Sequence, residues 1–231
     1  LHVRSRRQRQ MCIRDRVIEE YKKNNNISEK MSFAGRLDPM AHGEMILLKG
    51  DECKLQNLYC GKDKIYEFKI LYGYKTDTLD ILGLVEKNNL EKELKLNNLI
   101  GKFEIVYPKY SSIYVKRKPL WWWAKNNKLD EIEIPKKKIE IYELCKKNEE
   151  TISNLELLKY ITEKISKLSK SNREKFRFSK IMKKWNIDLK TKKKHRIETY
   201  RTKVSSGTYI RSLCERMGGI ALDINRINII F

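Results

Sequence analysis

One segment of alternating residues limits the folds that are open to this chain. Residues 63–78 read DKIYEFKILYGYKTDT. Alternate residues of this run would share a side of a strand, with one side made by Ile65, Glu67, Lys69 and Leu71 and the other by Tyr66, Phe68, Ile70 and Tyr72. A period of two residues is that of a β-strand. The segment therefore predicts a strand whose tyrosines pack in the core or against a neighbouring strand.

Further segments divide between the period of a helix and the period of a strand. Helical spacing of apolar residues predicts helices over residues 17–24, 149–170 and 176–189. Strands are predicted over 44–50, 138–144 and 224–231, and a strand, a turn and a helix over 195–217. Residues 31–43 are expected to form a loop with apolar anchors, and 90–108 a helix followed by a strand or turn. Strands and helices mix without regular βαβ spacing, which predicts an α+β fold.

The charge balance indicates the class of partner. The chain has 231 residues with 51 Lys and Arg against 30 Asp and Glu, a formal net charge of +21. A charge of this size predicts attraction to polyanions, above all to nucleic acid, although a merely lysine-rich surface is the alternative. Hydrophobic residues make up 40%, which is enough for a core. No apolar run approaches the ~20 residues that a membrane span requires, so we expect a soluble protein.

The cysteines and histidines form no recognisable site. The five cysteines include no CxxC pair, and the three histidines are far apart in the sequence. We therefore expect no metal, no disulfide framework and a reducing, cytoplasmic location.

The first sixteen residues, LHVRSRRQRQMCIRDR, differ from the rest of the chain. They contain six arginines and lack apolar periodicity. One interpretation is a basic arm that binds nucleic acid. The other, which we favour, is a leader that is foreign to the gene, because MCIRDR resembles a translated sequencing adaptor. Without this leader the net charge falls by five to +16, so the expectation of a polyanionic partner remains.

Three separated motifs contain the residue types of an active site. The first, GRLDPMAHG at residues 35–43, holds Asp38 between an apolar residue and a proline. A carboxylate on a rigid loop can act as a nucleophile, but an aspartate before proline also commonly caps a turn. The second motif, TDTLDILG at residues 76–83, crowds acidic and hydroxyl side chains toward a glycine. The third, SSGTYIRSL at residues 205–213, places Arg211 at the start of a helix, where it can pair with a buried carboxylate, bind phosphate or simply be exposed.

Taken together and in this order, these segments resemble the TruB-type tRNA pseudouridine synthases. The strand KIYEFKILYGYK, the segment YPKYSSIYVKRKPLWWWAK and the strand KKKIEIYEL add to the resemblance, which covers roughly residues 17–144 and 198–231. The resemblance implies a mixed, largely antiparallel sheet flanked by helices. It also implies one catalytic domain over 17–231, with a basic helical insertion at about 145–197.

The resemblance implies specific roles for residues in the motifs. Asp38 falls on the catalytic aspartate of the family, Tyr66 on the tyrosine that stacks on the target base, and Arg211 on the arginine that pairs with the aspartate. The implied reaction isomerises a uridine in RNA to pseudouridine and needs no cofactor or metal. The implied substrate is the T-arm stem-loop of tRNA, bound by a monomer, with its target base flipped out of the stack. We expect the RNA to contact Phe33, Arg36, His42, Tyr110, Lys116, Lys118 and Tyr209.

Several departures from the family pattern accompany the resemblance. The suspect leader occupies the place of an N-terminal K-P-x-G-x-[ST] segment. Phe33 stands where the family often has a histidine, and Arg117 stands where a glycine is usual. We expect no C-terminal RNA-binding PUA domain. The alternative function is a non-catalytic RNA-binding protein, or a tRNA-folding chaperone, of the same fold.

Overall fold

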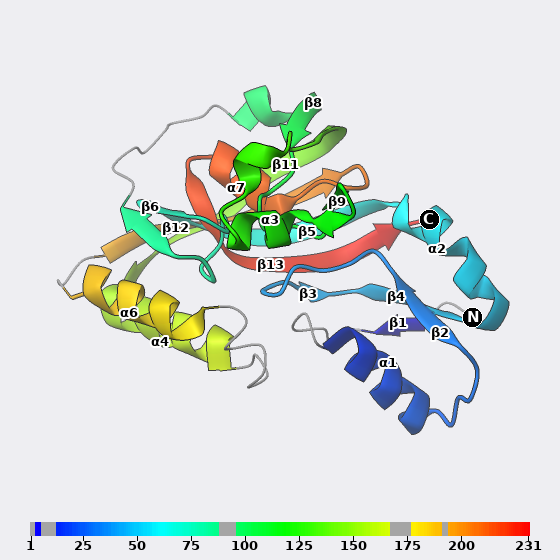
Figure 1. Cartoon of the computed structure of the whole chain (residues 1–231). Helices are drawn as coiled ribbons and strands as arrows, with labels where there is room; N and C mark the ends of the chain where they lie inside the picture. Colours follow the sequence, from blue (N-terminus) through cyan, green and yellow to red (C-terminus); the bar gives the residue numbers. More distant parts are fainter. Residues whose placement is uncertain (1–2, 6–12, 88–95, 167–176, 191–193) are drawn as a thin grey trace.

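A central sheet organises the molecule. The computed structural model describes residues 3–5, 13–87, 96–166, 177–190 and 194–231 (Figure 1). The six strands of the central sheet follow the order β3-β13-β5-β12-β11-β8. Their bounds are His42–Gly43 (β3), Gly219–Ile230 (β13), Asp63–Tyr72 (β5), Lys194–Val204 (β12), Lys136–Ser153 (β11) and Gly101–Val106 (β8). Every neighbouring pair is antiparallel except β13 with β3, so the predicted mixed, largely antiparallel sheet is confirmed.

The alternating segment forms the middle of this sheet. β5 pairs with β12 on one side and with β13 on the other. Tyr66, Phe68 and Ile70 are buried, whereas the residues between them are partly or fully exposed. The ring of Phe68 stacks on that of Tyr200 in β12, with 5.8 Å between centroids. The period of two in the sequence therefore reports one face of β5 that lies in the core.

A smaller sheet lies beside the central one. It has the order β1-β4-β2, with bounds Val3–Ser5 (β1), Met45–Lys49 (β4) and Met31–Ala34 (β2). Helix α1 (Ile13–Asn24) covers it, and Ile18 and Tyr21 pack against Met45 and Leu47. The expected loop over residues 31–43 is wrong for its first four residues, because they pair antiparallel with β4. The helix also begins at Ile13, four residues before the predicted start and inside the segment expected to be a leader.

The remaining elements are short and surround the ends of the central strands. The β-pairs are β6 (Tyr74–Thr76) with β7 (Val85–Lys87), and β9 (Tyr114–Val115) with β10 (Lys118–Pro119). The α-helices are α2 (Gln56–Cys60), α3 (Leu120–Lys125) and α7 (Ile210–Arg216). Three 3-10 turns complete the set: η1 (Gly50–Leu55), η2 (Leu96–Leu99) and η3 (Leu129–Glu131). The helix expected from residue 90 falls mostly outside the described residues, and its described end is the turn η2.

The insertion is a long β-hairpin arm that carries two helices. β11 and β12 remain paired out to Ser153 and Lys194. The predicted helix from residue 149 is therefore wrong over residues 149–153, where pairing with β12 extends the strand. The two helices, α4 (Asn154–Ser166) and α6 (Phe178–Asp188), lie side by side (Figure 1). Their buried residues join the main core, in agreement with the helical periodicity: Leu157, Ile161, Ile165, Ile181 and Trp185.

Within the described part of the chain, no helix combines the length and the apolar character that crossing a membrane requires.

Candidate active site

A cavity of about 930 Å³ brings the three sequence motifs together. The loop between β2 and β3 lines it with Arg36 and Asp38, and β5 lines it with Tyr66. The turn before α7 and the first turn of that helix line it with Tyr209 and Arg211. Residues that are far apart in the sequence therefore share one wall, as the resemblance implies.

Asp38 and Arg211 form a bidentate ion pair in this wall. Arg211 Nε donates to Asp38 Oδ2 at 2.7 Å, and Arg211 Nη2 donates to Asp38 Oδ1 at 2.8 Å. The guanidinium also donates to the main-chain carbonyls of Thr78 at 2.7 Å and Tyr110 at 3.2 Å. Only 2% of the Arg211 side chain is exposed, against 23% for Asp38. The arginine is thus a fixed part of the wall, and the carboxylate that it orients remains open to the cavity.

A second carboxylate lies behind Arg211. Asp80 is buried, and its Oδ2 lies 3.8 Å from Arg211 Nε. Its Oδ1 accepts hydrogen bonds from the Thr78 hydroxyl at 2.7 Å and from the main-chain nitrogen of Leu82 at 2.9 Å. Burial raises the pKa of Asp80 to about 6, and the positive charge of Arg211 partly opposes this shift. The TDTLDILG motif is therefore a turn built around Asp80 that supports Arg211 from behind.

The loop that carries Asp38 is held by an arginine that the sequence analysis did not identify. Arg226 on β13 is 1% exposed. Its Nε donates to the carbonyl of Glu44 at 2.6 Å, and its Nη2 donates to the carbonyl of Gly35 at 3.0 Å. Gly43 passes so close to β13 that a Cβ would lie 2.7 Å from Arg226 N, and its φ of +116° favours glycine. The two glycines that bound the GRLDPMAHG motif are therefore both tied to β13. A lone arginine in the apolar run INRINIIF was the available signal for this contact.

Tyrosines form much of the remaining wall. Tyr66 is 8% exposed and lines the cavity from β5, and its stacking on a base stays a prediction. Burial, followed by the negative charge of Asp38, raises the pKa of Tyr209 to about 12. The Tyr209 ring meets that of Tyr107 edge-on, with 5.7 Å between centroids. The shift moves the ionisation of Tyr209 further above physiological pH, where an ordinary tyrosine is already neutral.

Cationic side chains also line the cavity. Lys64 precedes Tyr66 by two residues, and its Nζ donates to the carbonyl of Cys60 at 2.8 Å. Burial, with the nearby charge of Arg226, lowers the pKa of Lys64 to about 8. Lys125 from α3 and Lys137 from β11 line the cavity as well. In the parts of the chain that the structure describes, no group of three or more His, Cys, Asp or Glu side chains is placed to hold a metal ion.

Comparison with known proteins identifies the family. The model of the TruB family pseudouridylate synthases, N-terminal domain, matches residues 22–158. The chain belongs to the TruB family. The tRNA pseudouridine synthase B of Caldicellulosiruptor saccharolyticus is 39% identical over 121 residues, which are 50% of this chain and 42% of that protein. The protein of the same name from Thermotoga maritima is 26% identical over 208 residues, 87% of this chain and 52% of that protein.

The chain spans about half the length of the curated relatives that it matches. Among solved structures, a chain from an H/ACA RNP bound to a substrate RNA containing 2′-deoxyuridine is similar over 99% of this chain and 47% of its own length. The TM-score is 0.50 and the sequence identity 13%, so this likeness concerns the fold.

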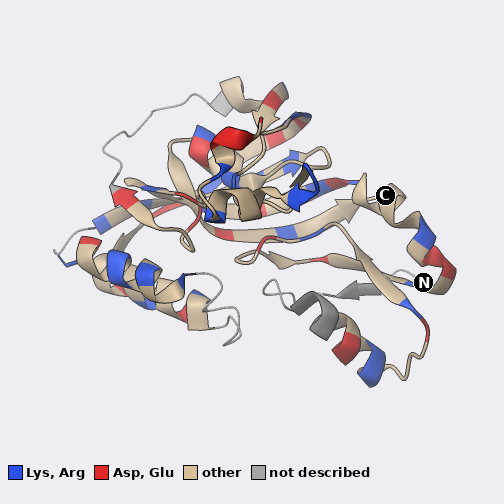
Figure 2. Cartoon of the chain, viewed as in Figure 1, with Lys and Arg blue, Asp and Glu red and all other residues tan. Residues whose placement is uncertain are grey.

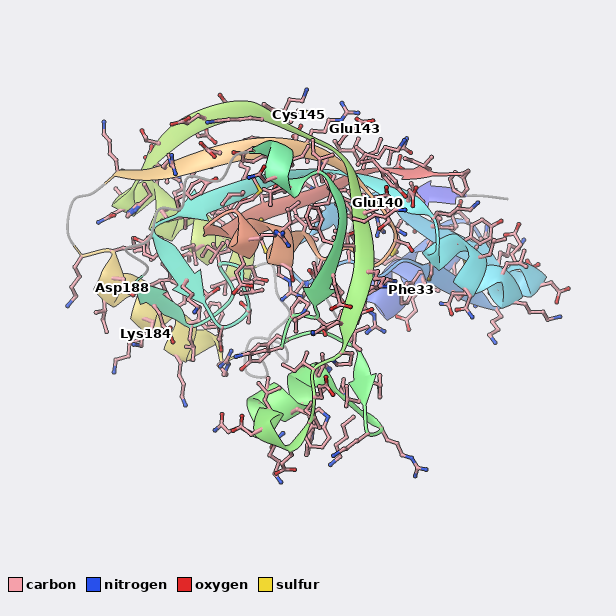
Figure 3. All side chains as sticks on the ribbon, turned by 90° about the horizontal axis from the view of Figure 1, so that it is seen from above. Phe33, Glu140, Glu143, Cys145, Lys184 and Asp188 are labelled. Carbon is pink, nitrogen blue, oxygen red and sulfur yellow. The ribbon has the colours of Figure 1, made fainter. Side chains whose placement is uncertain are left out.

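Three of the seven residues expected to contact RNA line the cavity described above, namely Arg36, Tyr110 and Tyr209. The other four do not line it. Phe33 lies on β2 near α1 (Figure 3) and packs against the cluster of Met45 and Leu47. His42 Nε2 lies 2.9 Å from Asp223 Oδ2.

The two lysines of the β9–β10 turn have local partners. Lys116 Nζ donates to the carbonyl of Glu131 at 3.0 Å, and Lys118 Nζ lies 3.5 Å from the centre of the Trp122 ring. Trp123 is buried, as expected for at least one of the three tryptophans. RNA contact at all seven of these residues stays a prediction.

Proposed function

We propose that this protein isomerises uridine to pseudouridine in RNA, and that its substrate is a uridine in the T loop of tRNA. The observation that carries the proposal is the bidentate pair of Asp38 and Arg211 in the wall of a cavity that also holds Tyr66. The relatives named tRNA pseudouridine synthase B support the same assignment.

The chemistry needs one oriented carboxylate and no change in oxidation state. The bond from N1 of the base to C1′ of the ribose breaks, and a bond from C5 to C1′ forms. C5 loses a proton and N1 gains one, so atoms and electrons balance. Asp38 can add to C1′, add to the base, or stabilise the positive charge that develops on the ribose. Because Arg211 holds both oxygens, the orientation of the carboxylate is set before substrate binds.

The tyrosines hold the base while it is detached from the sugar. Tyr66 presents an aromatic ring from a rigid strand, which suits stacking on a pyrimidine. The proposal gives Tyr66 the further task of helping to remove the C5 proton after the new bond forms. Tyr209 lines the same cavity and, like any neutral tyrosine, can donate a hydrogen bond from its hydroxyl group to the substrate.

The shape and charge of the cavity suit a nucleotide that has left its stack. A uridine inside a stacked loop cannot bring its C1′ to Asp38 unless the nucleotide flips outward. Arg36 and Lys125 are exposed residues that also line the cavity, so they can meet the flanking phosphates. We propose that the protein acts as a monomer with one catalytic domain over residues 17–231, in the cytoplasm, where its thiols remain reduced.

Release of tritium from RNA labelled at C5 of uridine tests this proposal, because the reaction replaces the C5–H bond. We expect the protein to release tritium from a T-arm stem-loop and to release none when the target uridine is replaced by cytidine. A folded protein that binds the stem-loop without releasing tritium would refute the catalytic proposal and favour a non-catalytic RNA-binding function.

A further inference from the structure

The insertion contributes a cation to the active-site cavity. Arg177, the residue before α6, lines the cavity although it lies far along the chain from the family motifs. Its Nη2 lies 2.8 Å from Asp77 Oδ2, and its guanidinium carbon lies 5.0 Å from the centre of the Tyr110 ring. Its side chain is 25% exposed. Asp77 and Tyr110 therefore hold the guanidinium in place, and part of it remains accessible from the cavity.

The position of Arg177 is unfavourable for helix stability. It is the N-cap of α6 and has φ 57° and ψ 30°, in the left-handed region. This conformation costs a non-glycine residue about 1 kcal/mol, and N-caps are normally extended Ser, Thr, Asp or Asn. A cation at a helix N-terminus also opposes the helix dipole. Helix stability therefore does not explain why residue 177 is an arginine. The position of its guanidinium at the cavity explains it better.

Two lysines continue the line of positive charge away from the cavity. Lys180 and Lys184 follow Arg177 at three and seven residues, which places all three on one side of α6. The rise from Arg177 to Lys184 is about 10 Å. Ile181 and Trp185 are buried along the border of this side, whereas Lys180 and Lys184 are themselves exposed. Figure 2 shows Lys and Arg along this helix, and Figure 3 places Lys184 on it.

Among the residues that the structure describes, one of the three cations is paired with an acidic group, and the two lysines are not. The ion pairs formed between described residues include Arg177 with Asp77 but none with Lys180 or Lys184. Asp188 is the one acidic residue of α6 and lies in its last turn (Figure 3). Its charge acts on Tyr74, whose pKa is raised to about 12 mainly by burial and secondly by Asp188.

We propose that Arg177, Lys180 and Lys184 form a track that binds successive phosphates of the RNA strand leaving the active-site cavity. The track rests on the proposed function, because that function supplies the RNA. Arg177 would contact the phosphate nearest the flipped nucleotide, since its planar guanidinium can bind phosphate bidentately. The two lysines act as point charges farther along the strand. The insertion thereby extends the binding surface of the catalytic domain.

The test is equilibrium binding of an unmodified T-arm stem-loop across a range of salt concentrations. The variant carries Arg177→Gln, Lys180→Gln and Lys184→Gln. At about 0.1 M salt we expect its Kd to rise at least about tenfold, and the slope of log K against log salt to fall in magnitude by about 2, or about 0.7 for each single-strand phosphate contact. Arg177→Lys, which keeps the charge, should recover part of the slope.

The control removes three charges elsewhere. Lys23→Gln, Lys30→Gln and Lys54→Gln change exposed lysines on and near α1 and η1, on the far side of the molecule from α6 (Figure 1). We expect this variant to keep the wild-type slope within about 0.5. Equal Kd values and slopes for the two triple variants would overturn the track, and would show that the lysines of α6 are merely solvated. If the protein binds RNA but never converts it, the proposed function fails, while loss of binding in the α6 variant still supports the track.

Discussion

Asp80→Asn offers a quantitative test of how the site is assembled. The variant removes a buried negative charge and keeps a side-chain oxygen that can accept the hydrogen bonds from Thr78 and Leu82. Burial raises the pKa of Asp80 from 3.8 to about 6, so the folded state binds the proton more tightly than the unfolded state. Between these two values the wild type therefore loses stability as pH rises.

The size of the expected change in stability follows from the pKa shift of Asp80. A shift of about two pKa units corresponds to about 3 kcal/mol, which is the cost of keeping Asp80 ionised above pH 6. Asparagine avoids this cost, and imperfect hydrogen bonding offsets part of the gain. We expect Asp80→Asn to raise the free energy of unfolding by about 1–3 kcal/mol at pH 7. Near pH 4, where the carboxyl of the folded wild type is largely protonated, most of this advantage should be lost.

Urea unfolding at pH 7 and at pH 4 measures the difference. Asp51→Asn is the matched control, because the Asp51 side chain is 93% exposed and pairs with Lys54 at the surface. That change should alter stability by less than about 0.5 kcal/mol at either pH. The reasoning is refuted if Asp80→Asn is less stable than the wild type at pH 7, or if the difference between the two proteins does not depend on pH.

Three further substitutions test other parts of the site. Arg211→Lys should destabilise the fold by about 3 kcal/mol in thermal or urea unfolding and reduce tritium release at least about 100-fold, because an ammonium cannot hold a carboxylate bidentately. Gly43→Ala should cost more than about 2 kcal/mol in urea, since the methyl group collides with the backbone of Arg226; unchanged stability would contradict this close approach. Lys164→Met should lower the free energy of unfolding by about 1–2 kcal/mol at pH 7, because Lys164 pairs with Asp223. Burial alone would raise the pKa of Asp223, but His42 and Lys164 together lower it to about 2. That loss should shrink as pH falls from about 4 toward 2, and a loss independent of pH would contradict the pairing.

The sequence predicts the elements whose pattern is local. The alternation of β5 reports its own burial, so Tyr66 and Phe68 fall on the core face as expected. The strand, turn and helix over residues 195–217 are likewise confirmed, because a Ser-Ser-Gly turn separates two different periods. The mixed sheet was implied by the family resemblance and is confirmed by the strand order.

The errors fall where partners distant in the sequence decide the structure. The helical spacing of apolar residues farther along predicted a helix from residue 149. Continuous pairing with β12 instead makes residues 149–153 the end of a strand. Met31–Ala34 becomes a strand because β4 provides an edge. The pairing of Asp38 with Arg211 spans 173 residues and was anticipated from the family motif, since no local pattern indicates it.

Arg226 shows what neither pattern nor motif conveyed. Arg226 donates to the carbonyls of Gly35 and Glu44, and the lone arginine in its segment does not indicate which main-chain carbonyls it will bind. The same holds for Arg177, whose place at the cavity follows from the fold of the insertion.

The most direct test of the central claim is single-turnover conversion of a T-arm stem-loop by Asp38→Asn. Asparagine preserves the size of the side chain, so the RNA should bind within about threefold of the wild-type Kd. The account predicts that tritium release falls by at least about 10⁴-fold. Asp80 is the other carboxylate among the described residues that line the cavity, and only 4% of its side chain is exposed, so it cannot replace Asp38. Asp51→Asn, in the same assay, should match the wild type. Conversion by Asp38→Asn at a rate near that of the wild type would contradict the account.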